Sequence, residues 1–141
     1  MLLAGIWIGM LIGLSFIETP LKFQAPGITR ELALGIGRLV FSTLNKIEIV
    51  YCLLMMTCWL VCWKNHTRWH VVFPILIIAI VALQTFYLLP ALQLRTDLVV
   101  AGETPEKSHH HWMYIFVEMV KIPALVAVFW SSWRLRSDET S

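Results

Sequence analysis

Four polar side chains occur close together in a stretch of this sequence that is otherwise typical of a membrane-spanning helix. In RLVFSTLNKIE, the residues Arg38, Asn45 and Glu48 occur at i, i+7 and i+10, and Lys46 flanks them. At 3.6 residues per turn, the first three share one face of a helix. A charged side chain near the centre of a bilayer costs about 2.5–3.5 kcal/mol on insertion scales, so such residues usually face the protein interior. The pattern therefore predicts a buried polar site on this helix.

A second polar stripe follows the histidine run in the last third of the chain. In HHHWMYIFVEMVK, the residues His111, Tyr114, Glu118 and Lys121 occur at i, i+3, i+7 and i+10, and hence on one helix face. In an antiparallel bundle of four spans, this stripe and the first one begin on the same side of the membrane. We therefore expect the second and fourth helices to form the walls of one polar cavity, open to one leaflet.

Cations in the two stripes favour an anionic ligand, such as an anionic small molecule, a lipid phosphate group or a propionate-bearing cofactor. Arg38 offers a fork of donors that matches carboxylate and phosphate. We expect Arg38 and Lys121 to contact the anion, and Asn45 and Tyr114 to orient it. Glu48 and Glu118 would pair with the cations or relay protons. The candidate ligand-binding residues are Arg38, Asn45, Lys46, Glu48, Tyr114, Glu118, Lys121 and Glu18.

Enzymatic chemistry is an alternative function for the same groups. The candidate catalytic residues, acting as acid and base, are Glu48, Glu118, His111 and Tyr114. A metal site would take its ligands from His111, His110, Glu118 and Glu48. Imidazole with carboxylate suits zinc, iron or manganese, but the neighbouring cations would repel a metal ion. The sequence identifies no cofactor.

A purely structural role is the other alternative. Glu48 with Lys121, and Glu118 with Lys46 or Arg38, would then be interhelical ion pairs that fix packing and register. In an accessory subunit of a larger membrane complex, the stripes would pack against a partner.

The composition places these stripes in an integral membrane protein. The 141 residues are 58% hydrophobic and 14% charged, against about 25% charged in a typical soluble domain, and the mean hydropathy is +0.72. We predict an all-α fold, an antiparallel bundle of four transmembrane helices in one domain over residues 1–136, with a polar tail at 137–141. The net charge of +2 and the lack of a basic run give no reason to expect nucleic acid as a partner. The predicted spans are 2–19, 34–63, 69–94 and 110–134.

The first predicted helix contains regularly spaced glycines and a proline near its end. Gly5, Gly9 and Gly13 form a small-xxx-small row that allows close approach of a helix from the same chain or from a second copy in a homo-oligomer. Pro20 is predicted to end this helix, and LKFQAPGITRE to form a loop or an interfacial segment. Trp7 is interpreted mainly as a residue of the membrane–water interface or of helix packing.

The distribution of lysine and arginine predicts the orientation in the membrane. The short link at residues 64–68 and the end of the last helix, with Arg134 and Arg136, are basic. By the positive-inside rule, we expect both termini in the cytoplasm and the cavity facing outward. Membrane lipid is then the obvious neighbour.

Two families share motifs with the chain. G-x-W-x-G-M, SFIETPLKFQAPG and GIGRLVFSTLNKIE resemble small bacterial four-helix membrane proteins of unknown function and, more loosely, the domain-of-unknown-function family typified by transmembrane protein 205. The resemblance to the bacterial proteins implies a location in a bacterial inner membrane. R-x6-N-x-x-E, formed by Arg38, Asn45 and Glu48, looks like the second-helix motif of the membrane-associated eicosanoid and glutathione metabolism proteins, and this resemblance implies glutathione binding in a trimer. The chain departs from that motif at Phe41, where those proteins usually have a second arginine.

Overall fold

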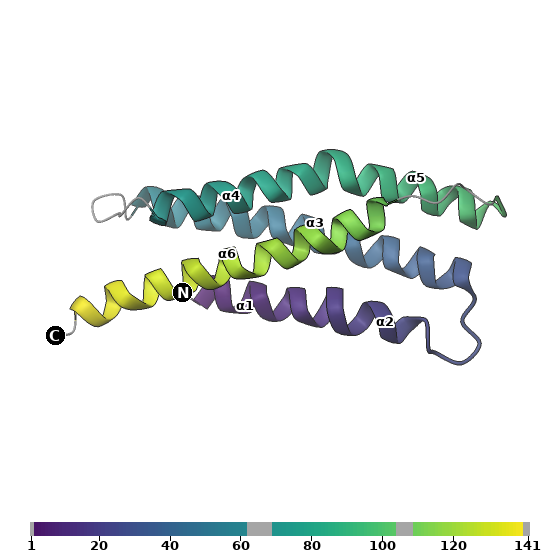
Figure 1. Ribbon diagram of the computed structural model, residues 1–141, viewed down its shortest axis with the longest axis horizontal. Coiled ribbons are helices and arrows are strands. Elements are labelled where there is room, and N and C mark those ends of the chain that lie inside the picture. Colours follow the sequence, from purple (N-terminus) through teal and green to yellow (C-terminus); the bar gives the residue numbers. More distant parts are fainter. Residues whose placement is uncertain (1, 62–68, 104–108, 140–141) are drawn as a thin grey trace.

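The fold is a bundle of four long antiparallel helices (Figure 1). A computed structural model describes residues 2–61, 69–103 and 109–139, without the side chains of 69, 70, 111 and 134–139. All regular elements in these ranges are helical, so the predicted all-α bundle is confirmed. In chain order, the elements are α1 (Leu2–Leu11), η1 (Ile12–Glu18), α2 (Thr19–Lys22), α3 (Arg30–Val61), α4 (Trp69–Leu83), η3 (Gln84–Leu88), α5 (Leu89–Val100) and α6 (His110–Glu139).

Four segments within the described residues are long and apolar enough to cross a membrane, and this is an integral membrane protein. Large apolar side chains lie on the outside of the bundle, for example Phe86, which is 82% exposed, and Leu39, which is 69% exposed. An apolar outer surface suits lipid rather than water. The four segments are Leu2–Lys22, Arg30–Val61, Val71–Val100 and Trp112–Trp133.

Two of the prolines that lie inside continuous helices follow directly after a π-helical segment. η1 ends two residues before Pro20, and η3 ends two residues before Pro90. Local π-helical adjustment satisfies the carbonyl that a proline would leave without a donor. The prediction that Pro20 ends the first helix is therefore wrong, because the helix continues through it to Lys22.

The helices also extend past three of the predicted ends. α3 begins at Arg30, after Thr29, whose hydroxyl accepts a hydrogen bond from the Leu32 amide at 3.3 Å and so caps the helix. α5 continues to Val100, and the chain turns at Gly102, which has φ +84°. α6 continues to Glu139, beyond the predicted start of the polar tail at 137, because polar residues outside the bilayer do not by themselves stop a helix.

Packing brings the four helices around a common core. α6 packs against α1 and α4, while α3 packs against α4 and α5 (Figure 1). Trp7, Leu44, Ile77 and Leu125, one residue from each long helix, are among the buried residues of the core. The polar residues considered below therefore meet in the interior of a four-helix bundle.

Candidate functional site

Six side chains with polar atoms lie together in the interior of the bundle, each at most 1% exposed. They come from four segments, α1, α3, η3 and α6, so only the tertiary fold brings them together. Lys121 lies about 16 Å along α6 from its first residue, near the middle of a hydrocarbon layer about 30 Å thick. We call this set the buried polar cluster, and its members are Trp7, Glu48, Gln84, Tyr114, Glu118 and Lys121.

The ammonium of Lys121 forms the centre of the cluster. Its Nζ donates to Glu48 Oε1 at 2.5 Å and to Glu118 Oε1 at 3.3 Å. Glu48 lies on α3, so the shorter contact joins two helices, whereas Glu118 lies one turn before Lys121 on α6. The ion pair between Glu48 and Lys121 that the packing interpretation predicted is therefore present.

In each carboxyl group, a neutral donor also contacts the oxygen that accepts from Lys121. Trp7 Nε1 donates to Glu48 Oε1 at 3.1 Å, and Gln84 Nε2 donates to Glu118 Oε1 at 2.9 Å. Neither donor was among the predicted site residues. Gln84 carried a usable signal, since a lone amide in an apolar membrane helix needs a polar partner. Trp7 carried none, because an indole near a helix end suits the membrane interface equally well.

The other polar atoms of the cluster have no hydrogen-bond partner among the described residues. They are three acceptors and one hydroxyl group: Glu48 Oε2, Glu118 Oε2, Gln84 Oε1 and Tyr114 OH. The Tyr114 hydroxyl is close enough to both carboxyl groups to interact with their charge and approaches Glu118 without reaching hydrogen-bond distance. The cluster therefore has more buried acceptor atoms than donors that reach them.

Asn45 is also buried, but its hydrogen-bond partner is not a member of the cluster. Its Nδ2 donates to Thr85 Oγ1 at 3.1 Å, and the Thr85 hydroxyl lies 2.7 Å from the carbonyl of Val81. This contact links α3 to η3. The structure therefore gives Asn45 a partner within the bundle.

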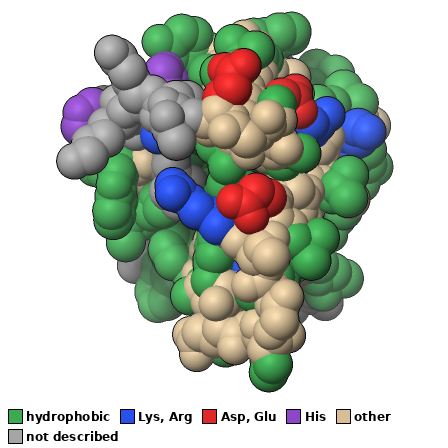
Figure 2. All heavy atoms as spheres, turned by 90° about the vertical axis from the view of Figure 1, so that its right-hand side faces the viewer, with side chains coloured by type: hydrophobic (Ala, Val, Ile, Leu, Met, Phe, Trp, Pro, Cys, Tyr) green, Lys and Arg blue, Asp and Glu red, His purple; other side chains and the backbone are tan. Residues whose placement is uncertain are grey.

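A cavity of about 340 Å³ lies at the end of the bundle where α2, α3 and α5 meet. This is the right-hand end in Figure 1, and Figure 2 shows charged side chains gathered on it. Four cationic residues line the cavity, and none of the lining residues that the structure describes is acidic. We call it the cationic cavity, and it is lined by Thr19, Lys22, Phe23, Arg30, Ala33, Leu34, Gly37, Arg38, Phe41, Leu89, Leu92, Gln93, Arg95, Thr96, Val99 and Trp112.

Two of these cations have acidic partners outside the lining. The side chain of Lys22 is 7% exposed, and its Nζ lies 3.3 Å from Glu18 Oε2. Arg38 forms an ion pair with Asp97, and its side chain is 43% exposed. Arg95 is different, because its Nη1 is buried and has no hydrogen-bond partner among the described residues.

Lys22 also depends on a glycine in the helix that faces it. Its Nζ lies over the ring of Phe41, 5.3 Å from the centroid. A Cβ atom added to Gly37 would lie 2.9 Å from that Nζ, so only glycine at this position leaves the ammonium in place. One added to Gly35 would have nothing within 4 Å.

Two aromatic rings separate the cationic cavity from the buried polar cluster. Phe41 lines the cavity, and its ring packs edge-on against Tyr114, with the centroids 5.0 Å apart. Tyr114 belongs to the cluster and lies one turn before Glu118 on α6. The two sites are thus neighbours along the bundle.

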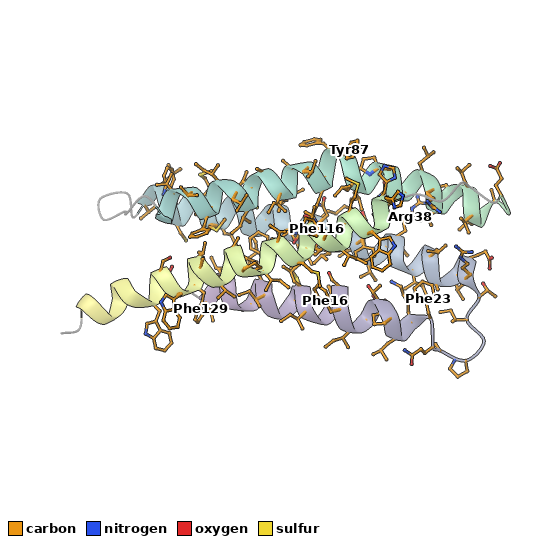
Figure 3. The ribbon with its side chains drawn as sticks, in the orientation of Figure 1. Phe16, Phe23, Arg38, Tyr87, Phe116 and Phe129 are labelled. Atoms are coloured by element: carbon orange, nitrogen blue, oxygen red, sulfur yellow. The ribbon has the colours of Figure 1, made fainter. Side chains whose placement is uncertain are left out.

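The structure does not gather the predicted ligand-binding residues into one site. Of them, Glu48, Tyr114, Glu118 and Lys121 join the cluster, whereas only Arg38 lines the cavity. Figure 3 labels Arg38 in the right-hand half of the bundle. The cavity lies between α2, α3 and α5, with Trp112 from α6, rather than between the second and fourth helices. Glu18 lies beside Lys22, behind the cavity lining.

The alternative ion pairs of Glu118 are wrong. Glu118 contacts Lys121, whereas Arg38 pairs with Asp97. Lys46 is exposed. It lies two residues before Glu48, and a separation of two residues rotates a side chain by about 200° around the helix, so Lys46 lies on the face opposite to Glu48.

The histidine run does not reach the cluster at the positions that are described. His109 is exposed, and the half-buried His110 packs near Tyr87, with ring centroids 6.0 Å apart. The side chain of His111 lies outside the described residues. Among the residues that are described, no group of three or more His, Cys, Asp or Glu side chains is placed to hold a metal ion.

Comparison with known families identifies the family of the chain, and the description of that family names no activity. The chain belongs to the family described as Domain of unknown function (DUF4149), which matches residues 2–96. The match includes Trp7, Glu48 and Gln84 and nearly all of the cavity lining, whereas α6 lies outside it. No curated protein and no solved structure matches the chain.

Proposed function

We propose that this DUF4149 protein binds an anionic amphiphile, a molecule with a phosphate or carboxylate head and an apolar portion, in the cationic cavity. The observation that carries the proposal is Arg95, which lines the cavity with a buried guanidinium nitrogen that has no partner among the described residues. Leaving a buried charged donor unsatisfied costs free energy, and an anionic acceptor would remove that cost.

The charges around the cavity agree with an anionic head group. Glu18 and Asp97 offset the charges of Lys22 and Arg38, so among the described lining residues Arg30 and Arg95 provide the excess positive charge. A guanidinium offers parallel donors that match the oxygens of phosphate and carboxylate. We therefore assign the head group to the part of the cavity lined by Arg30 and Arg95.

The remaining walls suit an apolar portion of the ligand. Leu34, Phe41, Leu89, Leu92 and Trp112 contribute apolar surface. A volume of about 340 Å³ is at the lower end of the range of about 300–1,000 Å³ for small-molecule sites. This volume suits a lipid head group with the first part of its chain, or a compact anion such as a peptide-like carboxylate.

The predicted orientation would place the cavity in the outward-facing half of a bacterial inner membrane, with both termini in the cytoplasm. This rests on the basic link at residues 64–68 and on the positive-inside rule. A second copy of the chain has space at α1, because a Cβ atom added to Gly9 or Gly13 would have nothing within 4 Å. We keep the homo-oligomer as a proposal on that ground.

Native mass spectrometry of the full chain in a neutral detergent tests the proposal. The added probes are phosphatidylglycerol, phosphatidylcholine, glycerol phosphate and glutathione, each in a separate titration. We expect phosphatidylglycerol to be retained better than phosphatidylcholine. Retention of glycerol phosphate alone would indicate a free anion as the ligand, and retention of glutathione would support the transferase-like alternative.

Charge-matched variants locate the site. Arg95→Gln is expected to weaken phosphatidylglycerol binding about tenfold or more, since a hydrogen bond to a charged group contributes about 1.5–3 kcal/mol. Lys46→Gln removes one positive charge from an exposed position outside the cavity and is expected to leave binding unchanged. Equal retention by the two variants, or equal retention of the two phospholipids by the unaltered chain, would refute the proposal.

Gly37→Ala perturbs the cavity without changing any charge. The added methyl group displaces the Lys22 ammonium, which is the end of a flexible side chain, so the fold is expected to persist while binding weakens. Gly35→Ala on the same helix is the control, since its methyl group meets nothing.

A further inference from the structure

We infer that Glu48 and Glu118 form a proton-binding site in the middle of the membrane, which holds one proton in addition to the ammonium of Lys121. The proposal concerns the buried polar cluster and does not depend on ligand binding in the cationic cavity. The ligand is a proton, and its binding forms one O–H bond on one of the two carboxyl groups.

The first argument is the count of charges. Two carboxylates and one ammonium, all at most 1% exposed, leave one negative charge without compensation. A charge buried without a partner costs several kcal/mol, and such a group is neutralised instead. Two carboxyl groups that share a site keep one proton between them for the same reason. One bound proton makes this cluster neutral.

The second argument is the set of unpartnered atoms. Glu48 Oε2, Glu118 Oε2 and Gln84 Oε1 are buried acceptors that lack a donor among the described residues. A proton on either carboxyl group converts one of these acceptors into a donor. The added proton thus corrects the shortage of hydrogen atoms as well as the excess of negative charge.

A metal cation fits the same place less well. The Lys121 ammonium lies 2.5 Å from Glu48 Oε1 and 3.3 Å from Glu118 Oε1, and it would repel a second cation held by the same carboxyl groups. Trp7 and Gln84 present N–H groups to the same two oxygens, and N–H groups do not coordinate metal ions.

The surroundings supply few other groups that can titrate. On α3, Cys52 lies within electrostatic range of Glu48 and Lys121, and on α6, Tyr114 lies beside the carboxyl groups. The neighbouring groups from α1 and η3 are the indole of Trp7 and the amide of Gln84, which do not titrate in the ordinary range. The proton is therefore assigned to the two glutamates.

Tyr114 marks the route by which a proton would enter. It is the member of the cluster that contacts Phe41, which lines the cationic cavity, so the way from the cavity to Glu118 passes these two rings. Displacement of the Phe41 ring would open the cavity toward the Tyr114 ring that it now covers. A buried site with such an entrance can exchange its proton.

Infrared spectroscopy of the full chain, with ¹³C-labelled glutamate and in lipid nanodiscs, counts the protonated glutamates at neutral pH. We expect one protonated buried glutamate in the unaltered protein, none in Glu48→Gln or Glu118→Gln, and two in Lys121→Met. These numbers follow because the net charge of the cluster must also be zero in each variant. Glu31→Gln, at an exposed position, is the control and should leave the count at one. Circular dichroism establishes that each variant is folded.

The count in the unaltered protein tests the proposal even if a variant fails to fold. No protonated buried glutamate at neutral pH would overturn it, and so would a signal that persists in both Glu48→Gln and Glu118→Gln. Loss of the signal on addition of sodium or potassium would also overturn it, because a metal cation would then hold the place of the proton. A signal that is unaffected by these salts supports the assignment.

Discussion

The contact between Lys121 and Glu48 is the interaction in this bundle whose energetic role can be tested most directly. Replacing Lys121 by Met keeps a side chain of similar length but removes the ammonium that contacts both carboxyl groups. Breaking a buried ion pair costs about 3–5 kcal/mol, because the remaining charge is left without a partner. We expect the lower end of that range here, since protonation of both carboxyl groups relieves part of their repulsion.

The structure also predicts which carboxyl group interacts more strongly with the ammonium. Coulomb attraction varies as 1/r, so for an equal share of the negative charge the contact at 2.5 Å to Glu48 is about a third stronger than the contact at 3.3 Å to Glu118. Close charge pairs give coupling energies of about 1.5–7 kcal/mol in double-mutant cycles. We expect at least about 2 kcal/mol for Lys121 with Glu48, and a smaller value for Lys121 with Glu118.

Reversible unfolding in mixed micelles, followed by far-ultraviolet circular dichroism, measures these free energies. The cycles use Lys121→Met, Glu48→Gln and Glu118→Gln, with the two double variants that contain Lys121→Met. Glutamine keeps the shape of glutamate, removes the charge and replaces one acceptor oxygen by an NH2 donor. A coupling energy near zero for both pairs, or a larger one for Glu118, would refute the assignment of the dominant contact to Glu48.

Two further changes test the packing around this contact. Trp7→Phe removes the N–H that reaches Glu48 Oε1, and we expect a loss of about 1–2 kcal/mol in the same unfolding assay; unchanged stability would show that the indole contributes only its apolar surface. Gly5→Leu adds a side chain where a Cβ atom would already lie 3.6 Å from Phe129, and overpacking of this kind costs about 1–3 kcal/mol. Gly9→Leu is the control, since a Cβ atom there would have nothing within 4 Å, and an equal effect of the two leucines would contradict the packing.

Local periodicity predicted much of the polar stripe on α6. Tyr114, Glu118 and Lys121 recur every three or four residues, and all three are buried, as a shared helix face requires. The stripe on α3 was predicted less well. Asn45 and Glu48 are buried, whereas Arg38 lies at the end of the bundle and pairs with Asp97, because ten residues of helix carry a side chain about 15 Å along the axis and out of the same neighbourhood.

The sequence by itself determined that four apolar helices cross a membrane and that Glu48, Glu118 and Lys121 lie inside them, because length, hydropathy and helical period are local properties. Only the tertiary structure decided which groups meet. It brought Trp7 and Gln84 to the two carboxyl groups, and it placed Lys22 and Arg95 beside Arg38 in a cavity separate from the cluster. These contacts depend on the rotation and axial offset of each helix relative to its neighbours. Side-chain packing across the whole bundle sets both quantities.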